Sequence, residues 1–137
     1  MAREVSVGTF RVAVQIGSLA GLRFQELELL VDTGSTHTLI PRPLLERLGV
    51  RPVRQVRFQL ADERAVSYEV GPATMRIGDI QLPVLVVFGP PDAEPLMGAT
   101  TLEIFNLAAD PVGQRLVEVD GLLKAVQRVQ APAKTGA

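Results

Sequence analysis

Apolar residues recur at every second position along most of this chain, and this period of two limits the folds that it can adopt. The pattern is clear in TFRVAVQIG, residues 9–17, where Phe10, Val12, Val14 and Ile16 are all apolar. Alternation of this kind is typical of strands that bury one face. The same reasoning predicts further strands over residues 24–34, two around a turn at 61–64, two within 73–89 joined at Gly78-Asp79, and one over 114–120 after a turn at 110–113.

Two segments have the spacing of short helices instead. In RPLLERLGV, residues 42–50, the side chains of Leu44, Leu45 and Leu48 fall on one helical face. In ATTLEIFNL, residues 99–107, a threonine precedes an apolar helical face, as at many helix starts. The sequence therefore predicts a mainly β fold with two short helices. We expect one domain over residues 1–129 and a disordered tail over 130–137.

Composition excludes several classes of function. Fourteen basic residues nearly balance fifteen acidic ones among the 137, so no strong charge favours nucleic acid or an anionic membrane as a partner. The chain has no cysteine and one histidine, His37, which excludes thiolate and multi-histidine metal sites and leaves carboxylate sites for magnesium or calcium open. We expect no metal site and no cofactor. Neither a signal peptide nor a membrane span is evident, and we expect a cytoplasmic protein.

The chain also contains a weak internal repeat. Two segments, residues 14–40 and 75–105, each read as a strand, an Ile-Gly turn, an apolar strand, and then a glycine followed by a small residue. The first copy has Asp32 two residues before its glycine, whereas the second copy has Leu96 there. A site built from paired carboxylates would therefore have only one of its two acids in this chain.

Three motifs, in order, resemble those of a known family. LLVDTGSTHTLI, residues 29–40, resembles the active-site loop of the retropepsin-like aspartic proteases. PLMGATTLEIFNLAADPVGQRL, residues 95–116, resembles their second motif, here Leu96, Met97 and Gly98 before a short helix and a last strand. FQLADERAVSYEV, residues 58–70, stands where that family has its flap hairpin. The resemblance covers residues 9–119 and implies a closed, barrel-like retropepsin fold with one lobe per chain.

The resemblance implies a catalytic role for Asp32, acting with its symmetry mate in a homodimer. Two carboxylates that share one proton supply both a general base for water and an acid for the substrate carbonyl. Thr33 would hold the two loops together across the two-fold axis. Gly34 would supply its N–H to the carboxylate, and Ser35 would donate its hydroxyl to the ionised form. A plain turn, in which Asp32 bonds the backbone two residues on, is the alternative.

The other motif residues have simpler alternative interpretations. The resemblance places Ala61, Asp62, Glu63 and Arg64 at the flap tip, where the family often has glycines, and a solvated turn explains these residues equally well. We expect His37 to pack or to lie on the surface. Tyr68 either packs within its strand or lies over the active site.

Two functions remain. The first is a cofactor-free aspartic endopeptidase that acts as a homodimer on peptides or unfolded proteins. The second is a non-catalytic, dimeric, peptide-binding scaffold of the same fold, since fold alone does not determine function. The intact Asp-Thr-Gly-Ser at residues 32–35 favours the enzyme, because a scaffold does not need a carboxylate there. A glycosidase-like use of two carboxylates is a more distant third.

Overall fold

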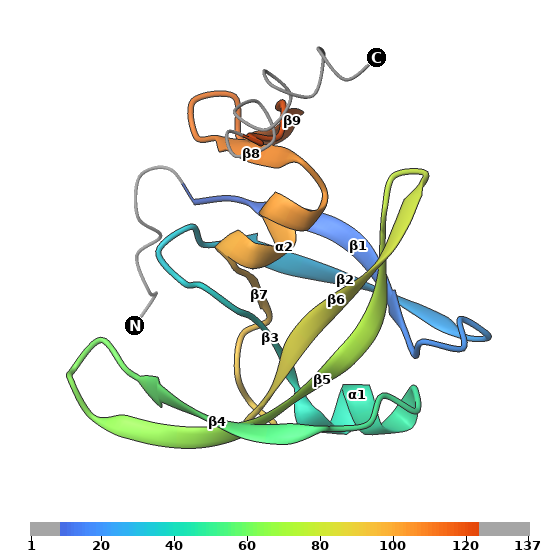
Figure 1. Cartoon of the computed structure of the whole chain (residues 1–137), viewed down its shortest axis with the longest axis vertical. Helices are drawn as coiled ribbons and strands as arrows, with labels where there is room; N and C mark the ends of the chain where they lie inside the picture. Colours follow the sequence, from blue (N-terminus) through green and yellow to red (C-terminus); the bar gives the residue numbers. More distant parts are fainter. Residues whose placement is uncertain (1–8, 124–137) are drawn as a thin grey trace, which may run out of the picture.

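A computed structural model describes residues 9–123, and these residues form a mainly β fold with two short helices, as predicted (Figure 1). The predicted tail at residues 130–137 lies outside the described residues. None of the described helices is long and apolar enough to cross a membrane. The elements are β1 Arg11–Gly17, β2 Phe24–Val31, β3 Thr38–Pro41, α1 Arg42–Arg47, β4 Arg54–Gln59, β5 Ala65–Ile77, β6 Ile80–Gly89, β7 Leu96–Met97, α2 Ala99–Ile104, β8 Leu107–Asp110 and β9 Arg115–Glu118.

The main sheet closes on itself. Its strands follow the order β1-β2-β7-β3-β6-β5-β4, and β1 also pairs with β5, so six strands form a ring with β4 outside it. The closing contact is short and antiparallel, and it joins residues 15–17 of β1 to residues 74–76 of β5. This contact covers the end of the β1 edge at residues 15–17, which shortens the strand edge that could pair with another chain.

The internal repeat is visible in the strand pairing. One half runs from β2 through a loop into β3 and α1, and the other runs from β6 into β7 and α2. β2 pairs in parallel with β7, and β3 pairs in parallel with β6. The two halves therefore interlock, and the register places Leu30 opposite Leu96. The loop that contains Asp32 consequently emerges beside the second motif.

The core lies inside this ring and is built by the apolar positions of the alternating strands. β2 ends in three buried residues, Leu29, Leu30 and Val31, immediately before Asp32. This apolar triplet anchors the strand end, since burying such side chains stabilises the fold by about 1.5–3 kcal/mol each. The largest fully buried apolar side chains are Phe88, Ile16, Leu29, Ile40, Leu45, Met75, Met97, Val31, Val70 and Val86.

The strand β5 differs from the sequence prediction, which divided it near Gly71-Pro72. It runs unbroken for 13 residues. Along β5, pairing with β4 ends at Val70 and pairing with β1 begins at Thr74. Pro72 lies between these two stretches, so β6 is its one neighbouring strand. Proline is tolerated there because its missing N–H faces no partner strand. Gly71 is required by crowding, since a side chain would overlap the carbonyl oxygen of Arg51.

Three short strands, β3, β7 and β8, were not predicted, and β7 has only two residues. β3 has only four residues and leads directly into α1, so its alternation is too short to recognise. β8 occupies Leu107–Asp110, and its first residue had been assigned to the second helix, which instead ends at Ile104. Asn106 has a φ of 54°, a left-handed conformation that stops a helix.

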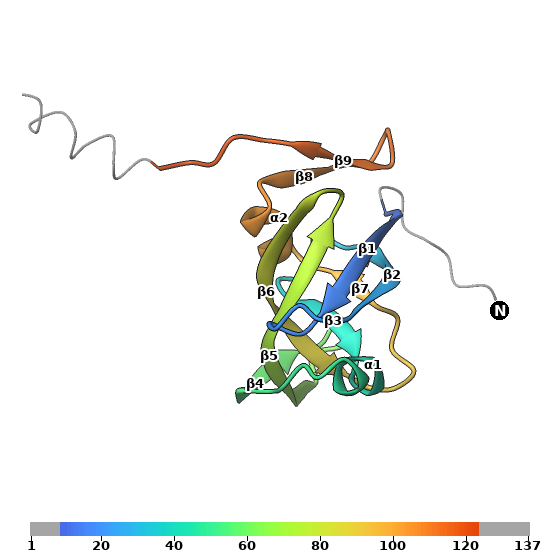
Figure 2. The same cartoon turned by 90° about the vertical axis from the view of Figure 1, so that its right-hand side faces the viewer.

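β8 and β9 form a separate two-stranded sheet that stands at one end of the molecule (Figure 2). Their turn is closed by Asp110, whose carboxylate accepts the Gly113 N–H at 3.1 Å and a bond from Arg115 Nε at 3.3 Å. The Gly113 hydrogen bond, helped by Arg115, lowers the pKa of Asp110 below its ordinary value. The predicted turn at residues 110–113 is thus confirmed.

Candidate active site

The loop of residues 32–37, called here the Asp loop, connects β2 to β3 and is held by backbone hydrogen bonds. Asp32 N–H donates to the carbonyl oxygen of Met97 at 3.0 Å, and Ser35 N–H donates to that of Asp32 at 3.1 Å. Just before the loop, Val31 N–H donates to the carbonyl oxygen of Phe10 at 2.8 Å. The backbone that leads into Asp32 is therefore fixed by partners distant in the sequence, and the Asp32 carbonyl oxygen by a bond within the loop.

The Asp32 carboxylate is half-buried and accepts two hydrogen bonds from its own loop. Gly34 N–H donates to Oδ1 at 3.1 Å, and the Ser35 hydroxyl donates to Oδ2 at 3.2 Å. The bond from Gly34 is also the one that a simple aspartate turn would make, so it does not separate the two interpretations. The bond from Ser35 adds a second donor and fixes the orientation of the carboxylate. Thr33, the residue between them, is exposed.

The second motif lies directly behind the Asp loop. Gly98 N–H donates to the hydroxyl of Thr38 at 3.0 Å, and that buried hydroxyl also bonds Thr101 at 2.6 Å. A side chain at Gly98 would overlap the backbone of His37, so this approach requires glycine. The two preceding residues, Leu96 and Met97, pair with the end of β2. The Asp loop and the second motif therefore lie side by side.

The loop is tied to α2 as well. Ala99 N–H donates to the carbonyl oxygen of Ser35 at 2.8 Å, and Thr100 donates both its N–H and its hydroxyl to that of Thr36, at 3.0 and 2.8 Å. These bonds leave the Asp loop little freedom to move relative to the core.

The hairpin predicted around residues 61–64 is formed by β4 and β5, and it projects from the ring on the side of the Asp loop (Figure 1). Its tip closes without glycine. Asp62 accepts the Arg64 N–H at 3.1 Å and Arg64 Nε at 2.6 Å, while Glu63 adopts a φ of 70°. Ala61 is exposed like the rest of the tip. The tip is a solvated turn held by its own charged residues.

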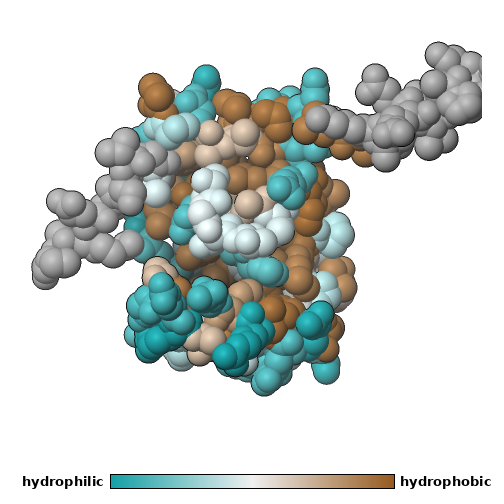
Figure 3. All heavy atoms as spheres, turned by 60° about the vertical axis from the view of Figure 1, so that its left-hand side comes forward, coloured by the Kyte–Doolittle hydropathy of each residue, from teal (hydrophilic) through white to brown (hydrophobic). Residues whose placement is uncertain are grey.

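A cleft of about 730 Å³ lies between the Asp loop and this hairpin. Figure 3 shows this face, with hydrophobic side chains visible between the hairpin and the body. Alternation along β4 turns its apolar residues inward, while its arginines and glutamines are exposed. Asp32 is the one acidic side chain among the residues that line the cleft. The apolar side chains that line it are Leu39, Val56, Phe58, Leu60, Val87 and Leu96.

A second hollow, of about 550 Å³, lies on another side of Asp32. It is bordered by the start of β1, by α2 and by β8, and most of its lining is small or apolar. Asp32 lines both hollows, and Thr33 lines this second one. The carboxylate thus stands at the boundary between them.

Two residues with undecided roles, His37 and Tyr68, both line the cleft. His37 packs at an edge-to-face angle against Phe58, with ring centroids 5.1 Å apart. Phe58 in turn lies 6.3 Å from Tyr68. Sequence reasoning did not single out Phe58, although its place between Val56 and Leu60 in the alternating pattern marked it as an inward-facing residue.

The described residues contain no group of three or more histidine, aspartate or glutamate side chains arranged to hold a metal ion. The arrangement at Asp32 offers a single oriented carboxylate beside an apolar cleft. Such a group can act as a general base or acid once a second acid is supplied.

The fold is similar to that of two solved viral proteases. One is the protease of simian foamy virus (mac), with a TM-score of 0.51 and 17% sequence identity, over 69% of this chain and 93% of that one. The other is the EIAV protease in complex with the inhibitor HBY-793, with a TM-score of 0.50 and 19% identity, over 78% of this chain and 90% of that one. At such low identity these likenesses show the fold. A search of the curated proteins found no match.

The sequence itself matches the family described as aspartyl protease over residues 12–101. This range contains the Asp loop, the β4–β5 hairpin and the start of the second motif, and all three contribute residues to one cleft. The match extends over more than half of the chain, and the fold is that of the retroviral proteases. This chain therefore belongs to the aspartyl protease family and is retropepsin-like.

Proposed function

We propose that the chain is an aspartic endopeptidase that acts as a homodimer. The observation that carries this proposal is that one oriented carboxylate, Asp32, stands at an apolar cleft whose lining contains no second acid. Peptide hydrolysis by paired carboxylates requires two. A second copy of the chain supplies the other Asp32 by symmetry, as in most homodimers, which use the same surface on both subunits.

The chemistry divides between the two carboxylates. The ionised one takes a proton from a water molecule, whose oxygen attacks the peptide carbonyl carbon. The protonated one donates its proton to the carbonyl oxygen. Collapse of the resulting intermediate breaks the C–N bond, and the proton taken from water passes to the amine leaving group. A hydroxyl proton of the intermediate returns to the other carboxylate, so that the pair again holds one proton. In this scheme Gly34 and Ser35 hold the ionised carboxylate in the required orientation.

The surroundings of Asp32 support a dimer. Thr33 is exposed beside the second hollow, whose lining includes Val31, Leu102 and Ala109. In the proposed dimer this side faces the second copy, and the cleft on the other side receives the substrate. The apolar cleft lining favours peptides with apolar side chains near the cleaved bond. The β4–β5 hairpin then acts as the flap, with Ala61–Arg64 at its tip.

The test is a cleavage assay on a denatured protein, with wild type compared to Asp32→Asn. We expect the variant to lose activity by several orders of magnitude. It should keep its circular dichroism spectrum, because the asparagine oxygen can still accept the Gly34 N–H and its amide N–H can donate to the Ser35 hydroxyl. Asp79→Asn, in an exposed turn, is the matched control and should cleave normally. EDTA should leave the wild-type rate unchanged.

Equal cleavage by wild type and Asp32→Asn would refute the proposal. Peptide binding without cleavage by the wild type would instead support the non-catalytic scaffold. Loss of activity in EDTA, restored by a divalent ion, would show that the reaction depends on a metal.

A further inference from the structure

We propose that His37 is a positioning residue that holds the β4–β5 hairpin over Asp32 through its contact with Phe58. The contact joins two segments that line opposite sides of the cleft, the Asp loop and β4. The kinetic consequences of this inference rest on the proposed function. Its structural part, the placement of the hairpin, does not.

The base of the contact is rigid. His37 lies between Thr36, whose carbonyl oxygen accepts two hydrogen bonds from Thr100, and Thr38, whose buried hydroxyl accepts the Gly98 N–H. The His37 backbone also lies so close to Gly98 that a side chain there would overlap it. The imidazole ring is therefore carried by backbone that cannot easily shift.

The hairpin has few other restraints. Among the described strands, β4 pairs with β5 and with no other. Near its base the hairpin is tied to α1 by Arg42, which donates to Glu69 at 2.5 Å and to Glu46 at 3.2 Å. These bonds raise the pKa of Arg42, with that to Glu69 contributing most. Closer to the tip than the Arg42–Glu69 bond, the contact between Phe58 and His37 is the aromatic contact that joins the hairpin to the Asp loop.

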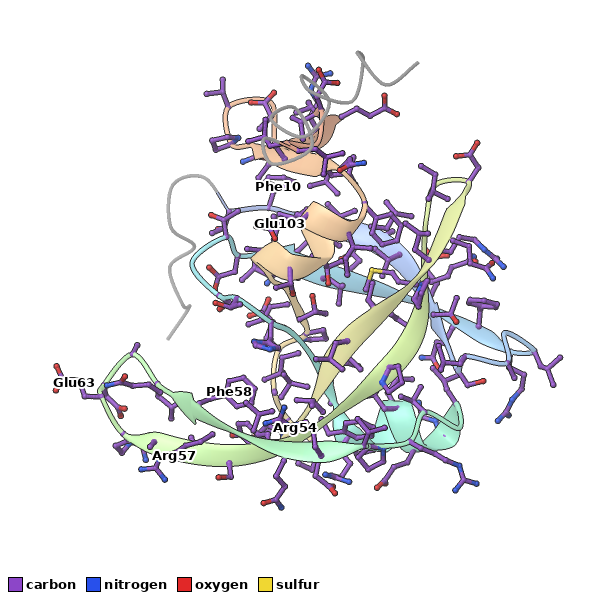
Figure 4. All side chains as sticks on the ribbon, viewed as in Figure 1. Phe10, Arg54, Arg57, Phe58, Glu63 and Glu103 are labelled. Atoms are coloured by element: carbon purple, nitrogen blue, oxygen red, sulfur yellow. The ribbon has the colours of Figure 1, made fainter. Side chains whose placement is uncertain are left out.

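The rings are suited to a directional contact. His37 and Phe58 meet at an interplanar angle of 83°, which is the edge-to-face arrangement that aromatic pairs favour. Phe58 lies on the side of β4 that faces the Asp loop (Figure 4). Tyr68, one diagonal position away across the β4–β5 pair, supports Phe58 from β5. The support matters because it limits the rotamers that Phe58 can adopt.

A contact of this kind predicts a specific kinetic signature. A hairpin already held near the Asp loop loses less freedom when substrate binds, so substrate binding is tighter. Removal of the ring should raise KM about three- to tenfold, which is the range that an aromatic pair of this geometry can account for. It should change kcat less, because His37 does not contact the carboxylate of Asp32 by any hydrogen bond found in the described residues.

The experiment compares three substitutions in the full chain. His37→Ala and His37→Asn both remove the aromatic ring, whereas His37→Phe keeps one. Hydrogen exchange of amides 54–66 reports opening of the hairpin, and thermal unfolding reports global stability. Gln55→Ala, an exposed change on the opposite face of β4, is the matched control. We expect these amides to exchange faster than wild type in His37→Ala and His37→Asn, and at the wild-type rate in His37→Phe. The Tm of all three variants should change little.

A double-mutant cycle adds an independent arm. If the contact is responsible, Phe58→Ala should accelerate exchange as His37→Ala does, and combining the two should add little further. Unchanged exchange in His37→Ala, or equal acceleration in His37→Phe, would overturn the inference. Because exchange needs no catalysis, this outcome is separable from failure of the proposed protease activity.

Discussion

The hydroxyl of Ser35 lies 3.2 Å from Asp32 Oδ2 and donates to it. Within residues 9–123 it is the one side-chain donor to that carboxylate, the other donor being the Gly34 N–H on Oδ1. The two oxygens therefore have different partners, and the orientation of the carboxylate depends on both.

Replacing Ser35 with alanine should lower the rate of peptide cleavage by about tenfold, because hydrogen bonds to charged groups contribute about 1.5–3 kcal/mol and part of that is recovered by water. Steady-state kinetics on one peptide substrate, with unfolding followed in parallel, would measure this. Ser18→Ala, in the turn between β1 and β2, is the control. A Ser35→Ala enzyme as active as wild type would show that the hydroxyl does not orient the carboxylate.

A shared site makes activity depend on the partner chain. Adding an equal amount of Asp32→Asn to a fixed amount of wild type should lower activity to about half, because random pairing gives half of the wild-type chains an inactive partner. Specific activity of wild type alone should fall on dilution, in parallel with dimer dissociation measured by sedimentation. Activity unaffected by the variant and by dilution would indicate that each chain holds a complete site.

The close approach of Gly98 to His37 predicts a stability effect. Gly98→Ala would place a methyl group against the backbone of His37, 2.8 Å from its amide nitrogen, and backbone cannot rotate away. Overpacking of this kind costs about 1–3 kcal/mol, so urea unfolding should show a loss of unfolding free energy in that range. Gly121→Ala is the control, since its nearest neighbour, Asn106 Oδ1, lies at an ordinary 3.5 Å. Equal stability of the two variants would contradict the close packing of the loop.

Asp110 predicts a pH effect confined to the β8–β9 turn. Its pKa is lowered, chiefly by the Gly113 N–H, so the folded turn binds a proton less readily than the unfolded chain does. The stabilisation is therefore complete above the ordinary pKa of an aspartate and is lost as pH falls through the lowered folded value. The protection factors of amides 107–118, which are their exchange rates corrected for the intrinsic pH dependence of amide exchange, should therefore fall over that acid range. Asp110→Asn should abolish this fall in protection, and Asp120→Asn should not. If the wild-type protection factors of these amides stay constant over the acid range, the assignment is wrong.

Much of this fold could be predicted because it depends on local alternation. β1, β2, β4 and β6 bury residues at alternate positions or in apolar runs, and both helices have an apolar face, so each element is recognisable without its neighbours. The elements that were missed depend on tertiary partners instead. β3 is held by β6 and β7, and β8 by β9. Short strands of this kind have little signal of their own.

The same distinction applies to the candidate site. Asp32 and its loop neighbours could be recognised because their hydrogen bonds run within four residues of sequence. The contact between His37 and Phe58 joins residues 21 positions apart, and it depends on how far the hairpin leans toward the loop. No local pattern specifies that angle. Likewise, Glu63 adopts a left-handed conformation that glycine favours, in a turn closed by the bonds between Asp62 and Arg64.

The crowding of Gly71 against Arg51 has a mechanical consequence for the hairpin. From Gly71 to the tip the strand extends about 25–30 Å, at about 3.3 Å per residue, so it acts as a lever arm with its pivot at that glycine. A rotation of about 10° at the pivot would swing the tip by about 5 Å, roughly the width of one side chain. Small changes in packing at residues 51–52, far from Asp32, can therefore widen or narrow the entrance of the cleft more than comparable changes made at the tip itself.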